Sequence, residues 1–162
     1  MISSLLKWVL PVIAILVVAG LFTRKTFHVE AVIPAAPHEV WKILMDTEAY
    51  PDWNPVFVHV QGDYVQGGKV RNKVRDPEGK FLEMSAAVKN LTENRELRQT
   101  GGLFGVITFD HRWRLEPVQG GTKVTQHEVD RGLYLWFWNS DWIEPAYAQV
   151  LVALENRLTD TQ

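Results

Sequence analysis

The spacing of hydrophobic residues changes along the chain, and each spacing predicts a different kind of element. Residues 5–22 are apolar apart from Lys7, and a helix of that length covers about 27 Å, close to the thickness of bilayer hydrocarbon. Arg24 and Lys25 end the apolar run. We therefore expect a single-pass transmembrane helix over residues 1–25. A cleaved signal peptide is the alternative, and the flanking charges are too balanced to predict the membrane side of the remaining chain.

Alternating apolar and polar residues predict strands in the rest of the chain. Residues 26–33 alternate cleanly, which is typical of a half-buried strand. Turns rich in Gly, Asn, Asp and Pro separate the further strands, which we expect over residues 56–61, 69–75, 81–91, 95–100, 106–116 and 122–133. Closely spaced strands joined by such turns favour an antiparallel sheet.

Helical spacing predicts one short and one long helix. Residues 37–45 begin with a proline, which suits the first turn of a helix, and continue with an apolar stripe. From Asp141 onward a second stripe covers about four turns. It consists of Ile143, Tyr147, Val150, Leu151, Leu154 and Leu158. This stripe needs a large apolar partner, and the sheet is the one available.

The segment YPDWNP at residues 50–55 lies between the short helix and the next strand. Its prolines are expected to hold the chain out of a helix. We expect Trp53 to fold back between the helical region and the sheet, and Asn54 to bind the backbone of the turn. The segment is therefore chiefly a corner that specifies the fold.

Composition and charge narrow the function. The chain has 162 residues, which fits one globular domain over residues 26–162 behind the N-terminal segment. All 19 acidic residues but only some of the 17 basic residues lie in that domain, so its negative charge gives no reason to expect nucleic-acid binding. The alternating cations of residues 69–75 are expected on a solvated strand face, with a patch for anionic headgroups as the alternative.

No metal or cofactor is expected. The chain has no cysteine, which excludes disulfides, zinc–thiolate sites and cysteine nucleophiles. His28, His38, His59 and His127 lack the spacing of paired metal ligands. The glycine-rich residues 101–105 lack the strand-to-helix context of a phosphate loop, and we expect them to form a flap beside a cavity.

Several motifs together resemble the SRPBCC superfamily, and within it the polyketide cyclase/dehydrase and lipid-transport branch. They are Val40-Trp41 followed by Asp46, YPDWNP at residues 50–55, Gly120-Gly121-Thr122 leading to Val124, and the long C-terminal helix. The WNP segment is the most specific of them. The resemblance covers nearly everything after Lys25.

The resemblance implies an α+β helix-grip fold in the order β-α-α-β6-α. In this fold a curved antiparallel sheet surrounds the long C-terminal helix and leaves an apolar cavity between them. Members bind lipids, sterols, polyketides or other hydrophobic ligands, and some catalyse cyclisation or hydrolysis. The resemblance implies no catalytic residue for this chain.

Charge pairing predicts how the strands align. Glu116 opposite Lys123 avoids the like-charge contact that the competing register would give between Lys123 and Arg114. The inward-facing residues are then Phe109, His111, Trp113, Leu115, Val124, Gln126, Glu128 and Asp130. The same reasoning pairs Lys73 with Glu83 in the preceding hairpin. That register turns Asn72 inward.

The inward polar and aromatic residues predict a ligand site. Phe109, Trp113, Met84, Trp136 and Tyr147 are expected to line the cavity, and His111, Glu128, Asn72 and Gln126 to orient a polar headgroup. His111 and Glu128 are also the candidates for catalysis, because a carboxylate can orient an imidazole that acts as a general base. The alternative is a buried structural pair whose members satisfy each other.

Aromatic residues are concentrated in residues 133–142, LYLWFWNSDW. They either cap one end of the core or form a cavity rim that touches lipid or admits a ligand. We therefore predict a membrane-tethered domain that binds or transfers a hydrophobic small molecule or lipid. The alternatives are a cyclase- or hydrolase-type enzyme using His111 and Glu128, and a membrane interaction module with a filled core. No protein partner can be named.

Overall fold

The computed structural model describes residues 2–160, with side chains described from residue 7 onward. Seven strands and several helices follow one another along the chain. Their order is α1 (Ile2–Phe22), β1 (Arg24–Ile33), α2 (Pro37–Met45), η1 (Thr47–Ala49), α3 (Tyr50–Trp53), β2 (Phe57–Gln61), β3 (Lys69–Arg75), β4 (Phe81–Thr92), β5 (Glu96–Leu103), β6 (Ile107–Val118), β7 (Gly121–Arg131), η2 (Leu133–Trp136) and α4 (Ile143–Thr159).

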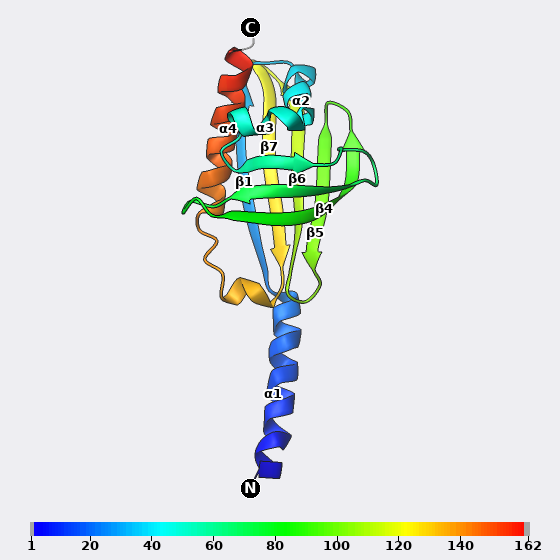
Figure 1. The fold of residues 1–162 in the computed structure, drawn as a ribbon, viewed down its shortest axis with the longest axis vertical. Coiled ribbons are helices and arrows are strands. Elements are labelled where there is room, and N and C mark those ends of the chain that lie inside the picture. The colour runs from blue at the N-terminus through cyan, green and yellow to red at the C-terminus, as the bar shows by residue number, and fades with distance from the viewer. Residues whose placement is uncertain (1, 161–162) are drawn as a thin grey trace.

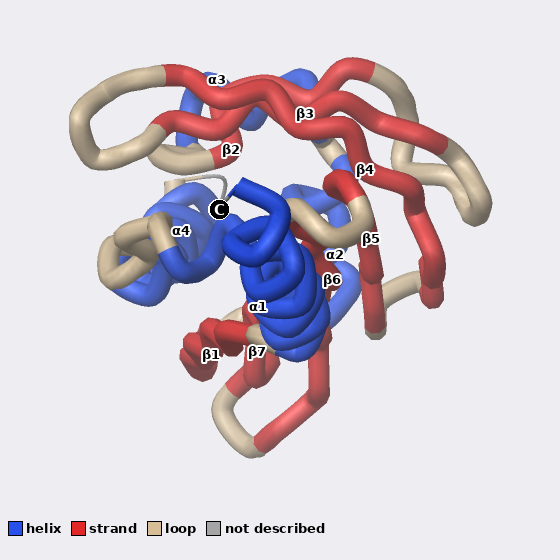
Figure 2. The backbone as a smooth tube through the Cα atoms, turned by 90° about the horizontal axis from the view of Figure 1, so that it is seen from below, coloured by secondary structure: helices blue, strands red, loops and turns tan. Residues whose placement is uncertain are grey.

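The strands form a single antiparallel sheet in the order β1-β7-β6-β5-β4-β3-β2. Figure 1 shows β2, β3 and β4 crossing the direction of β1, β6 and β7, so the sheet is strongly curved. Figure 2 shows the sheet as an arc that opens toward α4. This is the helix-grip arrangement that the sequence predicts.

The predicted strand registers are confirmed. Glu116 lies opposite Lys123, and their charged groups are 2.8 Å apart. Lys73 lies opposite Glu83. Because side chains alternate across a strand, these registers turn the predicted set of residues on β6 and β7 toward the core, where Leu115 and Val124 are almost fully buried.

The core lies between the concave face of the sheet and α4. Every predicted member of the apolar stripe on α4 is buried, including Val150 and Leu154 at 0% exposure. Burying a side chain of this size contributes about 1.5–3 kcal/mol. The long helix is therefore held to the sheet mainly by apolar contact.

The corner after α2 differs from its prediction in one respect. Residues Tyr50–Trp53 form the short helix α3, because a proline in the first turn of a helix leaves its ladder of hydrogen bonds intact. Asn54 behaves as expected, since its side-chain oxygen accepts hydrogen bonds from the backbone N–H groups of Val56 at 3.0 Å and Phe57 at 2.8 Å. Trp53 packs against the core, edge-on to the ring of Tyr50.

The expected transmembrane helix is corrected by the structure. Within the described part of the chain, no helix is both long enough and apolar enough to cross a membrane. The single-pass membrane localisation predicted from the sequence rested on this helix and is corrected as well.

Helix α1 projects from the end of the domain at which β1 begins (Figure 1). Its last turn contacts η2, where Gly20 lies against the side chain of Leu133 with no space for a Cβ atom. The indole N–H of Trp136 donates to the hydroxyl of Thr23 over 2.7 Å. These contacts fix the end of α1 beside the segment that follows β7.

Candidate functional site

A cavity of about 550 Å³ lies between the concave face of the sheet, η2 and the start of α4. Its wall is mainly apolar. The apolar part includes Phe57, Val74, Met84, Phe109, Trp138 and Ile143. A few polar groups reach the same space, and the most deeply buried of them come from β7 and α4.

Glu128 and Asp130 place two carboxyl groups in the cavity. They are two residues apart on β7, so both side chains point to the same face of the sheet. Their exposed fractions are 6% and 2%. On β6 they lie opposite His111 and Phe109, as the predicted register requires.

Hydrogen bonding differs between the two acids. The hydroxyl of Tyr147, on the buried face of α4, donates to Oε2 of Glu128 over 2.8 Å. Oδ1 of Asp130 is buried and has no hydrogen-bond partner among the described residues. The cavity therefore contains an acceptor that a bound molecule could use.

Burial dominates the titration of this pair. It raises the pKa of Asp130 to about 6, although a hydrogen bond with the Glu128 carboxyl group opposes that rise. Burial and then the neighbouring Asp130 carboxyl raise the pKa of Glu128 well above its usual value, although the hydrogen bond from Tyr147 opposes that rise. Since each buried charge disfavours the other, the two acids carry fewer than two negative charges near neutral pH.

His111 is not paired with Glu128. Its Nε2 lies 3.0 Å from the side-chain nitrogen of Gln126, a contact in which a neutral ring accepts a hydrogen bond from the amide. Burial lowers the pKa of His111 to about 3, so the ring is neutral at physiological pH. The imidazole packs among the rings of Phe57, Trp113 and Tyr147 and does not line the cavity.

The predicted site residues fall into three groups. Those that line the cavity are Met84, Phe109, Glu128 and Tyr147. Those that are buried in the wall behind it are Asn72, His111, Trp113 and Gln126. Trp136 stands apart, since it is 43% exposed and is hydrogen-bonded to Thr23 beside α1. The roles of all nine residues in ligand binding remain predictions.

Some lining residues were missed by sequence reasoning. Asp130 was placed on the inward face but not in the site, although its spacing from Glu128 was a sufficient signal. Trp138 and Trp142 belong to the aromatic segment that was expected at the rim. Val56 and Ile143 are far apart in the sequence, and no local pattern brings them together.

The mouth of the cavity is rich in exposed apolar side chains. Leu103 lines the cavity and is 65% exposed, and the adjacent Phe104 is 83% exposed. In the segment that follows β7, Tyr134 lines the cavity and Phe137 is 78% exposed. The two segments are joined by a backbone hydrogen bond from Tyr134 to Val106. The glycine-rich loop therefore lies beside the cavity, as predicted.

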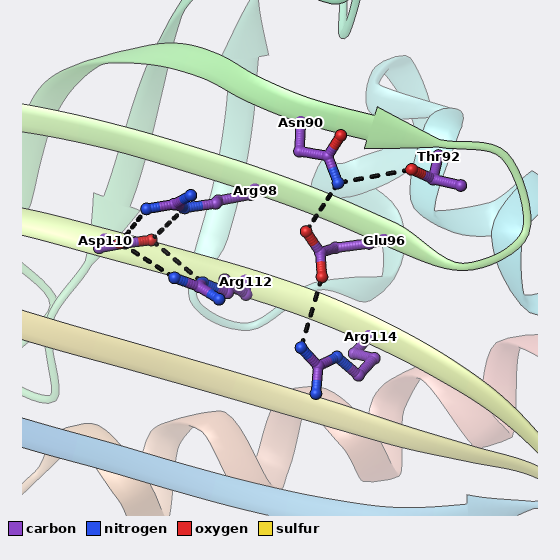
Figure 3. A network of polar contacts seen from close by, with 7 residues as sticks. All are labelled: Asn90, Thr92, Glu96, Arg98, Asp110, Arg112 and Arg114. Atoms are coloured by element: carbon purple, nitrogen blue, oxygen red, sulfur yellow. Dashed lines mark hydrogen bonds and ion pairs between the residues drawn. The ribbon is translucent and has the colours of Figure 1, made fainter.

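Arginines on the middle strands face away from the cavity. Asp110 lies between Arg98 and Arg112, and Glu96 lies between Asn90 and Arg114 (Figure 3). Arg98 binds Asp110 through two nitrogens at 2.9 and 2.7 Å. Burial alone would raise the pKa of Asp110, but the hydrogen bonds from the two arginines lower it to about 2. These cations are held on the outer face of the sheet.

The described residues contain no cluster of three or more side chains suited to hold a metal ion. The ionisable groups that line the cavity are carboxyl and phenol groups. They can accept or donate hydrogen bonds and exchange protons.

Several solved structures have a fold similar to that of this chain. A protein, NE0264, from Nitrosomonas europaea matches with a TM-score of 0.68 at 17% identity, covering 84% of this chain and 95% of its own. A protein from Rhizobium leguminosarum matches with a TM-score of 0.66 at 20% identity, covering 85% and 96%. The di-domain ARO/CYC StfQ of the steffimycin biosynthetic pathway matches with a TM-score of 0.69 at 9% identity, covering 85% and 52%.

No curated protein sequence matches the chain. The sequence profile of one family does match, over residues 24–159. That match spans the whole sheet and α4, and it agrees with the SRPBCC fold indicated by the sequence motifs. The chain belongs to the family described as polyketide cyclase/dehydrase and lipid transport.

Proposed function

We propose that the protein binds a small hydrophobic molecule in the cavity between the sheet and α4, without covalent chemistry. The observation that carries this proposal is the cavity itself, about 550 Å³ with a mainly apolar wall. Small-molecule sites are typically concave, apolar and roughly 300–1,000 Å³ in volume. The family description, which includes lipid transport, supports the same ligand class.

Different lining residues would contact different parts of the ligand. Met84, Phe109 and Trp138 would contact the apolar body of the ligand. Glu128 and Tyr147 would orient its polar end, since the hydrogen bond between them fixes both groups. The predicted contributions of Asn72, His111, Trp113 and Gln126 would then be indirect, through the wall that these side chains form.

Ligand access would pass the exposed aromatic rim around Phe104, Tyr134 and Phe137. Exposed apolar clusters are characteristic of interaction surfaces, and transfer of a lipid requires such a surface at the mouth of its cavity. Replacing the exposed rim residues Phe104 and Phe137 together by Ala should then reduce association of the protein with liposomes. Unchanged association would remove lipid contact from the proposal.

The second candidate is acid–base chemistry in the same cavity. It is favoured by Asp130, whose pKa is raised to about 6 by burial, because a general base works best with a pKa near the operating pH. His111 would not be the base, since burial lowers its pKa to about 3, its Nε2 is bonded to Gln126 and it lies outside the cavity. Turnover of the bound molecule that is abolished by Asp130→Asn would support this candidate, and turnover unaffected by that change would exclude it.

The proposed function is tested by native mass spectrometry of the full-length protein and by binding of the neutral dye Nile red. We expect a co-purified apolar molecule and dye binding. Met84→Trp would place a larger side chain in the cavity and should reduce dye binding at least tenfold. Val32→Trp adds the same ring at a position on β1 that is 53% exposed, so it should bind like the native protein. Equal binding by both variants would place the dye elsewhere.

A further inference from the structure

The charged side chains that line the cavity are all acidic. The ionisable side chains that line it are the acids Glu83, Glu128 and Asp130 and the phenols of Tyr134 and Tyr147. None of the lysines, arginines and histidines in the described region lines it. An anionic headgroup would therefore meet carboxyl groups without any cation to offset them.

Asp130 has an unused hydrogen-bond acceptor in this space. Glu128 already accepts a hydrogen bond from Tyr147, whereas Oδ1 of Asp130 is buried and unpartnered among the described groups. A buried carboxyl oxygen is costly to leave without a partner. A ligand with a positively charged donor at this end of the cavity would supply both the hydrogen bond and the countercharge.

The neighbouring elements do not supply that countercharge. Lys25 is opposite Asp130 on β1, but its ammonium donates to the backbone oxygen of Trp138 at 3.2 Å and the hydroxyl of Ser140 at 2.8 Å. From β6, His111 is neutral and bonded to Gln126. From α4, only the uncharged hydroxyl of Tyr147 reaches the acids.

We propose that the acidic end of the cavity selects a hydrophobic ligand that carries an ammonium group, and that it discriminates against anionic amphiphiles. This inference rests on the proposed function, because it names the ligand class of the same cavity. The ammonium would donate to Asp130 and Glu128 while the apolar chain lies along Met84 and Phe109. Burial raises the pKa of Asp130 only to about 6, so its carboxyl group is largely ionised at pH 7.5 and can bind a cation.

The test uses three probes with the same ten-carbon chain: decylamine, decanol and decyl sulfate. Their displacement of Nile red from the full-length protein is measured at pH 7.5, below their micellar concentrations. We expect decylamine to bind at least tenfold more tightly than decyl sulfate, with decanol between them. Asp130→Asn keeps the shape of the side chain but removes its charge, and should reduce the preference for decylamine at least fivefold.

Glu116→Gln is the matched control. It also removes one negative charge, but Glu116 lies on the outer face of β6 and pairs with Lys123, so the preference should not change. Decylamine that binds no better than decyl sulfate, or a preference that Asp130→Asn leaves intact, overturns the inference. If decanol binds in either case, the proposed function stands, whereas failure of all three probes overturns both.

A pH series on the unmodified protein tests the inference without any substitution. The probes keep their charge between pH 5 and pH 8, while Asp130 gains a proton as the pH falls. The preference for decylamine should therefore weaken on going from pH 8 to pH 5. A preference that is constant over this range would show that Asp130 does not carry it.

Discussion

At the scale of single residues, the hydroxyl of Tyr147 is the feature that fixes the acidic end of the cavity. Tyr147→Phe removes the donor to Glu128 and leaves a buried carboxyl oxygen unpartnered. A loss of this kind costs about 1–3 kcal/mol of unfolding free energy. Urea unfolding should show that loss. Tyr134→Phe removes the hydroxyl of a tyrosine that is 48% exposed, and should stay within about 0.5 kcal/mol of the native protein.

The titration of Asp130 gives a second prediction at this scale. Its pKa is raised from 3.8 to about 6 in the folded protein, so the folded state binds the proton more tightly than the unfolded state does. The resulting stability is complete below about pH 4 and is lost as the pH rises through about 6. Asp130→Asn removes this loss. The unfolding free energy of the variant, measured relative to the native protein, should therefore rise by about 2–3 kcal/mol as the pH is raised from 4 to 7.5.

The measurement is the difference in unfolding free energy between Asp130→Asn and the native protein across that pH range. A difference is needed because the lowered pKa of His111 acts in the opposite direction, with stability lost as the pH falls below about 6.5. Both proteins contain His111, so its contribution cancels. A difference that does not change with pH would contradict the titration of Asp130.

At this scale the sequence correctly predicted which side chains face inward, but it did not predict their hydrogen-bond partners. The alternation of β6 and β7 was enough to turn His111, Gln126 and Glu128 inward. It could not show that His111 bonds to Gln126 while Glu128 bonds to Tyr147. Those choices depend on side-chain torsions and on where α4 crosses the sheet, and neither is encoded in the spacing of residues.

At the scale of elements, α4 is the partner that the sheet requires. Leu154 lies fully buried in its apolar stripe, so Leu154→Ala should lower the unfolding free energy by about 2–5 kcal/mol through lost contacts and a residual void. Val152 lies on the same helix but is 58% exposed, and Val152→Ala should change it by a few tenths. Equal effects of the two changes in urea unfolding would mean that the stripe does not anchor the helix.

The elements themselves were largely predictable because each strand and helix carries its own periodicity. The family resemblance implied a second helix before β2, but the prolines of residues 50–55 were taken to exclude a helix there, although proline is accepted in the first turn. Helix α1 was predicted as a helix, but its assignment as a membrane span was wrong. That assignment rested on the hydrophobicity of residues 5–22 alone.

At the scale of the whole molecule, the cavity is a product of curvature. Residues from β2, β4, β6, β7 and α4 meet around it, and they are brought together because the sheet bends through the arc seen in Figure 2. Sequence patterns predict which face of each strand points inward. They do not predict how much space the bend leaves unfilled, so the cavity was expected only through the family resemblance.

An open cavity makes stability depend on its occupant, which gives the last prediction. A ligand that binds only the folded state stabilises it by about 2.7 kcal/mol at a concentration one hundred times its Kd. For a protein of this size, that corresponds to a rise in Tm of roughly 5–10 °C. Thermal unfolding with and without decylamine should show this rise in the native protein and in Val32→Trp. Met84→Trp should show a smaller rise, because its larger side chain occupies part of the cavity.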